Sequence, residues 1–290
     1  FLLSALTVPG LAGTNPAGTK LENTTLTGGA SANYGWILNS TDSRYGIYSP
    51  GFDLYNAAYS IPNGWIETSG EYAHGMFATG GYSSAENRGL IDTWGNYAAG
   101  MMAGPDADAW NYGTIYTNGA FAPGMAASGG TSSFARNSGS ILTFGGGSAG
   151  MAALGAGSEA YNYGSIVTSG DAAHGMTAGG ASSQAWNDGG TIQTSGAGSH
   201  GIVASGASAS GVNYIGGAIF TGGAGSHGMV ASGDASQITN RGTITTTGAG
   251  SHGMSATGTN AVARNDNAIA TEGSGSNGMA AGGPGSSTYN

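Results

Sequence analysis

The chain has 290 residues, of which 59 are glycine and only 7% are charged, and its formal net charge is −9. Six Lys and Arg residues are too few for the basic stripe that nucleic acid requires, or for binding an anionic lipid surface by charge. Cysteine is absent, which excludes disulfides and cysteine metal sites, and no apolar run of about 18 residues predicts a membrane span.

Residues 1–60 follow the chain's repeat only loosely, so we predict irregular N-terminal coils or a cap there. Two registers remain open. In the first, Trp36 lies ten residues after Leu26, and Ile47 begins a segment that mimics I-x-T-x-G. In the second, Ile37 takes the first apolar position of a coil and Ile47 the second.

The N-terminal end of a β-helix exposes strand edges and needs a cap. Candidate cap residues are Pro9, Pro16, Lys20, Glu22, Phe52, Tyr55 and Tyr59. Residues 1–6 have two interpretations, the tail of a signal sequence or part of the first coil.

From residue 61 to 290 the chain repeats a unit of about 25 residues, which is typical of a solenoid. A Gly-Met pair marks each unit, with Ile202 in the one position that lacks Met, at Met76, Met101, Met125, Met151, Met176, Met229, Met254 and Met279. An Ile lies ten residues before each of these, at Ile66, Ile91, Ile115, Ile141, Ile166, Ile192, Ile219, Ile244 and Ile269.

Alternate positions of the unit are restricted, whereas those between them vary freely. The consensus reads S/A-x-A-x-N-x-G-x-I-x-T-x-G, then four variable residues, then G-M-x-A-x-G. This period of two predicts strands with one buried face, so the Thr column (Thr168, Thr194 and Thr246 among its members) points inward. Glycine closes each Ile strand, where a corner needs positive φ or close backbone approach.

A second polar column is asparagine, about eleven residues after each Met. Its members include Asn87, Asn111, Asn137, Asn162, Asn187, Asn213, Asn240 and Asn265. Stacked coils would place these amides about 4.8 Å apart. We therefore predict a structural ladder of inward amides that hydrogen-bond along the axis, which makes their burial tolerable.

The pattern N-x-G-x-I-x-T-x-G…H-G-M-x-A resembles right-handed parallel β-helix proteins. More closely, it is similar to the repetitive passenger regions of bacterial autotransporter adhesins, and this resemblance covers roughly residues 60–290. It implies an all-β, single-stranded right-handed parallel β-helix of about 25 residues per coil. It also implies an extracellular or cell-surface location in a bacterium, with a structural or adhesive role.

Residues 286–290 match the S-x-A-x-N segment, so the chain stops in register with its repeat. This favours either a fragment of a longer protein or a subunit whose end continues into the next, making an open head-to-tail homopolymer. The expected partners are the chain itself, neighbouring surface proteins or glycans, and we expect no cofactor.

A histidine column occupies one position in four consecutive coils, at His174, His200, His227 and His252, with His74 earlier. Stacked imidazoles could bind zinc or copper, or switch with pH. The same position also holds Ala99, Pro123, Ala149 and Asn277. We therefore interpret the column as a corner residue stacked by the repeat, and expect no metal site.

Carboxylate pairs raise an enzymatic alternative, a carbohydrate-cleaving or carbohydrate-binding β-helix protein. Glu67 and Asp92 share an outward column, and Asp106 and Asp108 lie in one loop. Glycosidases need such pairs at set separations. Basic residues are nearly absent here, with Arg88 alone nearby, so we interpret these as solvated carboxylates and expect no catalytic residue.

Outward aromatic residues form the candidate contact surface, because exposed aromatics in columns suggest contact with a partner. Its members are Trp65, Trp94, Trp110, Tyr116, Tyr161 and Trp186. They could stack on sugars or pack against a neighbouring rod. The alternative is a set of scattered surface aromatics.

Overall fold

The structure, a computed structural model, describes residues 14–15, 20–22, 31–33, 36–40, 42, 45–50, 54–56, 64–80, 83–129 and 133–290. Within these residues every regular element is a β-strand, and the strands form three parallel sheets of 12, 11 and 10 strands. The described residues include no helix long and apolar enough to cross a bilayer.

Each sheet is named after a residue that its strands bury. The Asn sheet contains β1 (Thr14–Asn15), β3 (Ser31–Asn33), β6 (Leu54–Asn56), β9 (Ser84–Asn87), β12 (Asp108–Asn111), β15 (Phe134–Asn137), β18 (Glu159–Asn162), β21 (Gln184–Asn187), β24 (Ser210–Asn213), β27 (Gln237–Asn240), β30 (Val262–Asn265) and β33 (Ser287–Tyr289). The Ile sheet contains β2 (Lys20–Glu22), β4 (Trp36–Asn39), β7 (Trp65–Thr68), β10 (Leu90–Thr93), β13 (Thr114–Thr117), β16 (Ser140–Thr143), β19 (Ser165–Thr168), β22 (Thr191–Thr194), β25 (Ala218–Thr221), β28 (Thr243–Thr246) and β31 (Ile269–Thr271). The Met sheet contains β5 (Ile47–Pro50), β8 (Met76–Thr79), β11 (Met101–Ala103), β14 (Met125–Ala127), β17 (Met151–Ala153), β20 (Met176–Ala178), β23 (Ile202–Ala204), β26 (Met229–Ala231), β29 (Met254–Ala256) and β32 (Met279–Ala281).

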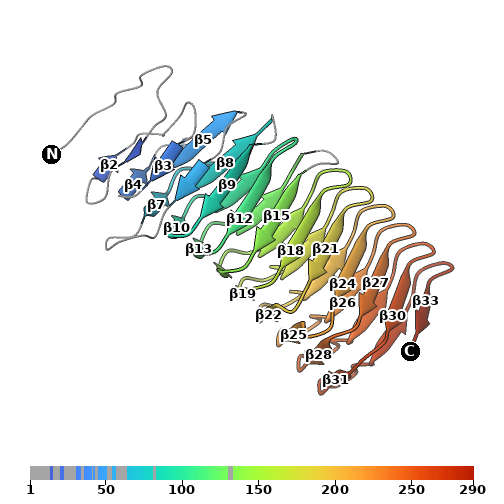
Figure 1. Cartoon of the computed structure of the whole chain (residues 1–290). Helices are drawn as coiled ribbons and strands as arrows, with labels where there is room; N and C mark the ends of the chain where they lie inside the picture. Colours follow the sequence, from blue (N-terminus) through green and yellow to red (C-terminus); the bar gives the residue numbers. More distant parts are fainter. Residues whose placement is uncertain are drawn as a thin grey trace.

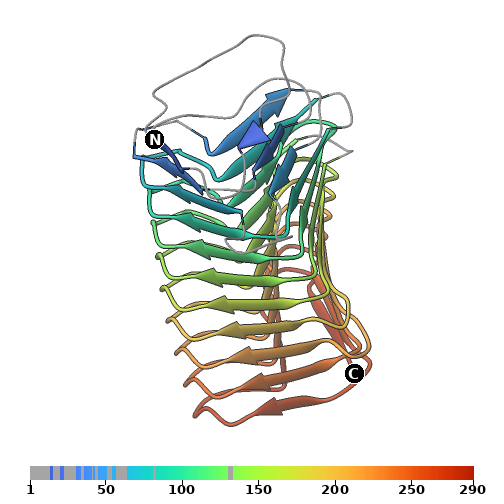
Figure 2. The ribbon, with the colours of Figure 1, turned by 60° about the vertical axis from the view of Figure 1, so that its left-hand side comes forward.

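Each coil takes one strand from each sheet, and every strand pairs with its counterparts in the coils before and after it. Thus β18 lies between β15 and β21, and β19 lies between β16 and β22. The coils stack along one axis from β2 to β33 (Figure 1), and Figure 2 shows them as regularly spaced rungs. The predicted parallel β-solenoid of roughly 25 residues per coil is confirmed.

The core is a thin stack of the restricted residues. In β19 the burial alternates, so that Ile166 and Thr168 are fully buried while Val167 between them is only partly covered. Met176 and Ala178 are fully buried in the same coil. Residues of one kind lie beside each other in register, as Ile141 and Ile166 do. The predicted alternation of inward and outward positions is therefore confirmed.

The structure separates the two reasons for glycine at the corner after each Ile strand. A Cβ at Gly95 would collide with the carbonyl of Gly70 in the previous coil, so the closing glycines serve close backbone approach. Positive φ occurs two residues later, for example at Tyr97 (φ 58) and Gly198 (φ 66). Of the two needs that the sequence left open for these glycines, close backbone approach is therefore the one that applies.

The N-terminal strands follow the second of the two predicted registers. Ile37 pairs with Ile66 and Ile47 pairs with Met76, so the register that placed Trp36 in a core position is wrong. A Cβ at Gly46 would lie 2.5 Å from the carbonyl oxygen of Gly75, just as one at Gly75 would lie 2.6 Å from that of Gly100. Gly46 therefore occupies the position of the glycine that precedes each Met.

Most candidate cap residues fall outside the described residues, namely Pro9, Pro16, Phe52 and Tyr59, as do residues 1–6. Of the others, Lys20 and Glu22 lie in β2 and Tyr55 lies in β6, so their backbones belong to paired strands.

Candidate binding surfaces

The asparagine column forms a continuous hydrogen-bonded ladder. Asn137 Nδ2 donates to Asn162 Oδ1, and Asn162 Nδ2 donates to Asn187 Oδ1, both at 2.8 Å. The same geometry joins every pair of successive members from Asn15 to Asn290 at 2.7–2.9 Å. From Asn56 to Asn265 each amide also donates to a carbonyl of its own corner, as where Asn162 donates to the Gly164 carbonyl at 3.2 Å. The side chains from Asn15 to Asn265 are buried and hold the coils together.

The threonine column is buried as well from Thr68 to Thr246, but its hydroxyls, that of Thr117 excepted, bond within their own coil. Thr168 donates to the Ala173 carbonyl at 2.6 Å, Thr194 to that of Ser199 at 2.5 Å, and Thr246 to that of Ser251 at 2.8 Å. Each bond spans the corner between the Ile and Met sheets. The threonines therefore brace corners, and the asparagines link coils.

A serine column that sequence reasoning missed links coils at that corner. Ser226 Oγ donates to the Gly196 carbonyl at 3.0 Å and accepts the Ser199 N–H at 2.9 Å. Ser199 and Ser251 make equivalent bonds. The signal was present, because Ser precedes His in three of the last four coils, in two G-S-H-G-M segments and one G-S-H-G-I segment.

The histidines stack in the next column. Ring centroids of His174, His200, His227 and His252 follow each other at 4.9–5.0 Å with nearly parallel planes. Each Nδ1 accepts the backbone N–H of the residue at the same position in the following coil, at 2.9–3.1 Å. The proton of each neutral imidazole therefore resides on Nε2.

Burial keeps the imidazoles of His174, His200 and His227 uncharged at neutral pH. It lowers the pKa of His200 to about 3, with help from repulsion by His174 and His227, and that of His227 to about 4, with help from His252. Burial also lowers the pKa of His174, and that of His74 to about 4. In the described part of the chain, no three His, Cys, Asp or Glu side chains converge closely enough to hold a metal ion.

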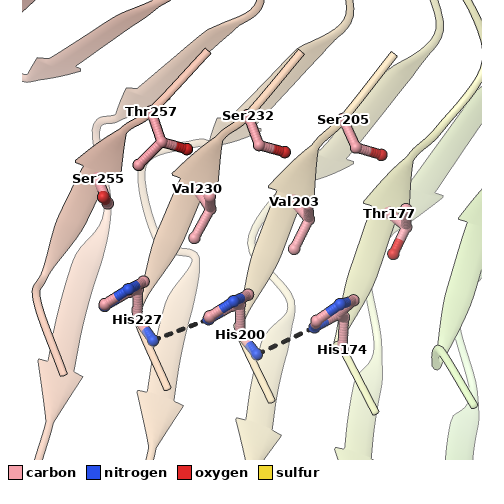
Figure 3. Close-up of a pocket in the computed structure, with 10 residues that line it drawn as sticks. All are labelled: His174, Thr177, His200, Val203, Ser205, His227, Val230, Ser232, Ser255 and Thr257. Atoms are coloured by element: carbon pink, nitrogen blue, oxygen red, sulfur yellow. Dashed lines mark hydrogen bonds between the residues drawn. The ribbon is translucent and has the colours of Figure 1, made fainter. Parts of the chain in front are cut away.

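A groove of about 440 Å³ runs beside this column over the outer face of the Met sheet. Its residues repeat from coil to coil and are His174, His200, His227, Thr177, Val203, Val230, Ser255, Ser205, Ser232 and Thr257. Figure 3 shows the imidazoles along one side, the valines in the middle and the hydroxyls of Ser205 and Ser232 along the other side. The lining contains no carboxylate and no Lys or Arg.

The outer face of the Asn sheet carries the densest group of aromatic side chains. We call it the aromatic–arginine face and define it as Trp110, Tyr112, Phe134, Arg136, Tyr161, Tyr163, Trp186 and Tyr214. Three of the predicted contact residues lie here, because Trp110, Arg136, Tyr161 and Trp186 occupy the same column of successive strands. Trp186 meets the Tyr161 ring edge-on, with centroids 4.6 Å apart.

Arg136 is the centre of this face. Its guanidinium carbon lies 4.4 Å from the Trp110 ring centroid, 5.1 Å from that of Phe134 and 5.4 Å from that of Tyr161. Among the described residues it forms no ion pair, whereas Arg88 pairs with Glu86. A guanidinium surrounded by rings is held by cation–π attraction and can offer its planar set of donors to a partner.

The remaining predicted contact residues lie on the Ile sheet or at its edge. Trp65 is 36% exposed and Trp94 is 54% exposed, and Tyr116 stacks on Phe144 at 6.4 Å. The predicted contact residues therefore divide between two sheets. A further aromatic stack, Tyr72 on Tyr97 and Tyr97 on Phe121, was missed by sequence reasoning.

Of the four carboxylates singled out in the sequence, only Glu67 and Asp92 lie together. Glu67 and Asp92 are paired neighbours on the Ile sheet, where burial and then repulsion by Glu67 raise the pKa of Asp92, while Asn118 donates to it at 2.9 Å. Asp106 lies in a turn with φ 53, and Asp108 begins β12 on the Asn sheet. Burial raises the pKa of Asp108, although Arg136 opposes that effect.

Comparison with known proteins gives one family. The family described as the BigA third pectate lyase-like domain has a model that matches residues 12–182. Neither the curated proteins nor the solved structures gave a match to this chain.

Proposed function

The chain belongs to the family of the BigA third pectate lyase-like domain, and on that premise we propose that it is a non-catalytic, adhesive β-solenoid of a bacterial cell surface. The family match and the repeat's resemblance to adhesin passengers both support a surface protein. Head-to-tail assembly stays a prediction, which electron microscopy of a dilution series tests.

The observation that carries the proposal is the aromatic–arginine face. Trp, Tyr and Arg are the residues that most often dominate binding energy at protein interfaces. Here they come from consecutive coils on paired strands, so the backbone fixes their positions before a partner arrives. In a chain with only 7% charged residues, this concentration of rings around one unpaired guanidinium favours contact.

The distribution of carboxylates supports a role without catalysis. A hydrolase of this shape needs two carboxylates facing one cleft. Glu67 and Asp92 are neighbours on the Ile sheet and Asp108 lies on the Asn sheet, whereas the groove lies over the Met sheet and has no carboxylate in its lining.

An adherence assay tests the proposal. Microspheres coated with the chain are washed over immobilised fibronectin, collagen and mucin, and retained spheres are counted. We expect retention on at least one surface, and loss of most of it when Trp110, Arg136 and Trp186 are all replaced by Ser.

The matched control replaces Val167, Gln193 and Phe220 by Ser, three outward residues of successive Ile-sheet strands. Circular dichroism checks that both variants fold. Equal retention of the two variants, or no retention of the parent chain on any surface, would reject the proposal.

A further inference from the structure

We propose that the groove beside the histidine column is a separate binding site for an extended, uncharged polysaccharide, which lies along the solenoid axis with about one sugar per coil. This site is independent of the aromatic–arginine face, because its residues come from the Met sheet and from the corner before it.

One wall offers a row of hydrogen-bond donors. Nδ1 of His174, His200 and His227 is occupied by a backbone N–H of the next coil, so Nε2 carries the proton. Within the described residues these Nε2–H groups have no partner. They repeat at the ring spacing of 4.9–5.0 Å.

The opposite wall offers hydroxyls in the same register. The side chains of Ser205, Ser232 and Thr257 make no hydrogen bond with other described residues, and Figure 3 shows the three side by side along the groove. A hydroxyl both donates and accepts. His200 with Ser205, and His227 with Ser232, therefore present an N–H on one side and a hydroxyl on the other, the complement of a sugar ring with hydroxyls on both edges, whereas the coil of His174 has Gly179 at the hydroxyl position.

The floor between the walls is apolar in the two middle coils, and this column ends in Thr177 on one side and Ser255 on the other. Val203 and Val230 occupy paired positions of β23 and β26, and each retains 6% exposure. Their methyl groups can pack against the C–H face of a sugar. Such a strip of apolar floor between polar rows is typical of small-molecule and glycan sites, where a few polar groups fix orientation.

The absence of charged side chains in the lining favours an uncharged polysaccharide over an acidic one. A polyanion would find no cation in this groove and would meet a protein of net charge −9. The low pKa values of the histidines support the same choice, because imidazoles with a pKa of about 3 or 4 remain neutral at pH 5 to 7 and do not attract carboxylates.

The spacing between equivalent groups of successive coils favours an extended sugar chain as the ligand. An extended β-linked pyranose chain advances by close to one coil per sugar, so that each ring can meet equivalent groups. A peptide strand advances about 3.3 Å per residue, so it would lose register with the coils after one contact. The geometry therefore favours a sugar polymer over a peptide.

Calorimetric titration of the purified chain with three hexasaccharides tests this site. Cellohexaose is extended and uncharged, maltohexaose is uncharged but coiled, and hexagalacturonate is acidic. We expect measurable binding of cellohexaose, and at least tenfold weaker binding of the other two.

Point variants locate the binding. His200→Ala and Ser232→Ala should each weaken cellohexaose binding about fivefold, the effect of one hydrogen bond. Val230→Phe should abolish it by filling the floor. Because Ala149 occupies the histidine position of another coil, His200→Ala is expected to fold. His74→Ala, at the same position outside the groove, is the matched control and should bind normally.

Three outcomes would overturn the proposal: no binding of cellohexaose, equal binding of hexagalacturonate, or binding that survives Val230→Phe. Binding lost in the variant of Trp110, Arg136 and Trp186 but kept in Val230→Phe would assign the glycan to the aromatic–arginine face. Because adherence is measured on that other face, failure here leaves the adhesive function standing, and failure of adherence leaves this site standing.

Discussion

Single asparagines link the coils because each amide bonds in both axial directions. Asn162→Ala would remove the side-chain acceptor of Asn137 Nδ2, leaving it the longer bond to the Gly139 carbonyl, and would remove the donor to Asn187 Oδ1, both in the core. We expect the free energy of unfolding to fall by about 3 kcal/mol, since an unsatisfied buried polar group costs about 1–3 kcal/mol. Urea denaturation measures this loss. Gln193→Ala, on the exposed side of β22, is the control and should change stability by about 0.5 kcal/mol or less.

Single histidines should make stability depend on pH. Their pKa values in the folded chain are depressed below the unfolded value of about 6.5, so the unfolded state binds protons first. Stability is therefore complete above pH 6.5 and falls as the pH drops toward 4. The limit is about 1.4 kcal/mol per pH unit for each such histidine.

Melting temperatures of the parent and of His200→Ala, measured from pH 7.5 to 4, test this dependence. The variant should lose less stability on acidification, because it lacks one imidazole that resists protonation. Parallel curves for the two proteins would contradict the assignment.

At this scale the sequence predicted which residues are buried but not what their polar atoms bond to. Asparagine, threonine and isoleucine recur at fixed positions, so periodicity alone indicated their inward direction. Each histidine Nδ1, and Ser226 Oγ, is hydrogen-bonded to backbone atoms of an adjacent coil. These bonds depend on the backbone conformation of the corner, which the repeat pattern does not describe. Tyr97 and Phe121 have positive φ at a position that is glycine in several later coils. The repeat pattern therefore did not predict that these two rings stack.

The strand and its corner form the next scale, where glycine decides whether coils can close. A Cβ at Gly175 would overlap Ile192 Cγ2 and lie 2.6 Å from the Gly201 carbonyl oxygen. Gly175→Val should therefore lower the unfolding free energy by about 3 kcal/mol or more, the range of severe core overpacking. Val167→Thr, outward on β19, should change it by about 0.5 kcal/mol or less. Thermal melts compare the two, and equal shifts would contradict the assigned positions.

Elements were predicted well where the repeat is regular and less well where it is not. The strands around Ile166 and Met176 follow from alternation, because each inward residue meets an identical neighbour. The order of coils before β7 needed the observation that Gly46 precedes Ile47. Trp65 and Trp110 lie on different sheets because the chain turns at the corner that follows each asparagine. The spacing of residues in the sequence does not predict the angle of that turn.

At the scale of the whole molecule, the register between coils determines which side chains of the repeat lie together on a surface. Residues about 25 positions apart become nearest neighbours. The aromatic–arginine face and the groove therefore each combine side chains from four or more coils. A slip of one residue would exchange inward and outward positions and abolish both surfaces.

Disulfide cross-linking tests that register most directly, because the natural chain has no cysteine. Val167 and Gln193 are paired across β19 and β22, whereas Thr191 pairs with Ser165. Paired residues fall within the distance a disulfide spans, and the diagonal pair, about 7–8 Å apart, falls outside it.

Double cysteine variants at Val167 with Gln193 and at Val167 with Thr191 are oxidised, and free thiols are titrated. We predict nearly complete cross-linking of the first pair and little of the second. Equal cross-linking, or preference for the second, would contradict the stacked register on which both binding surfaces depend.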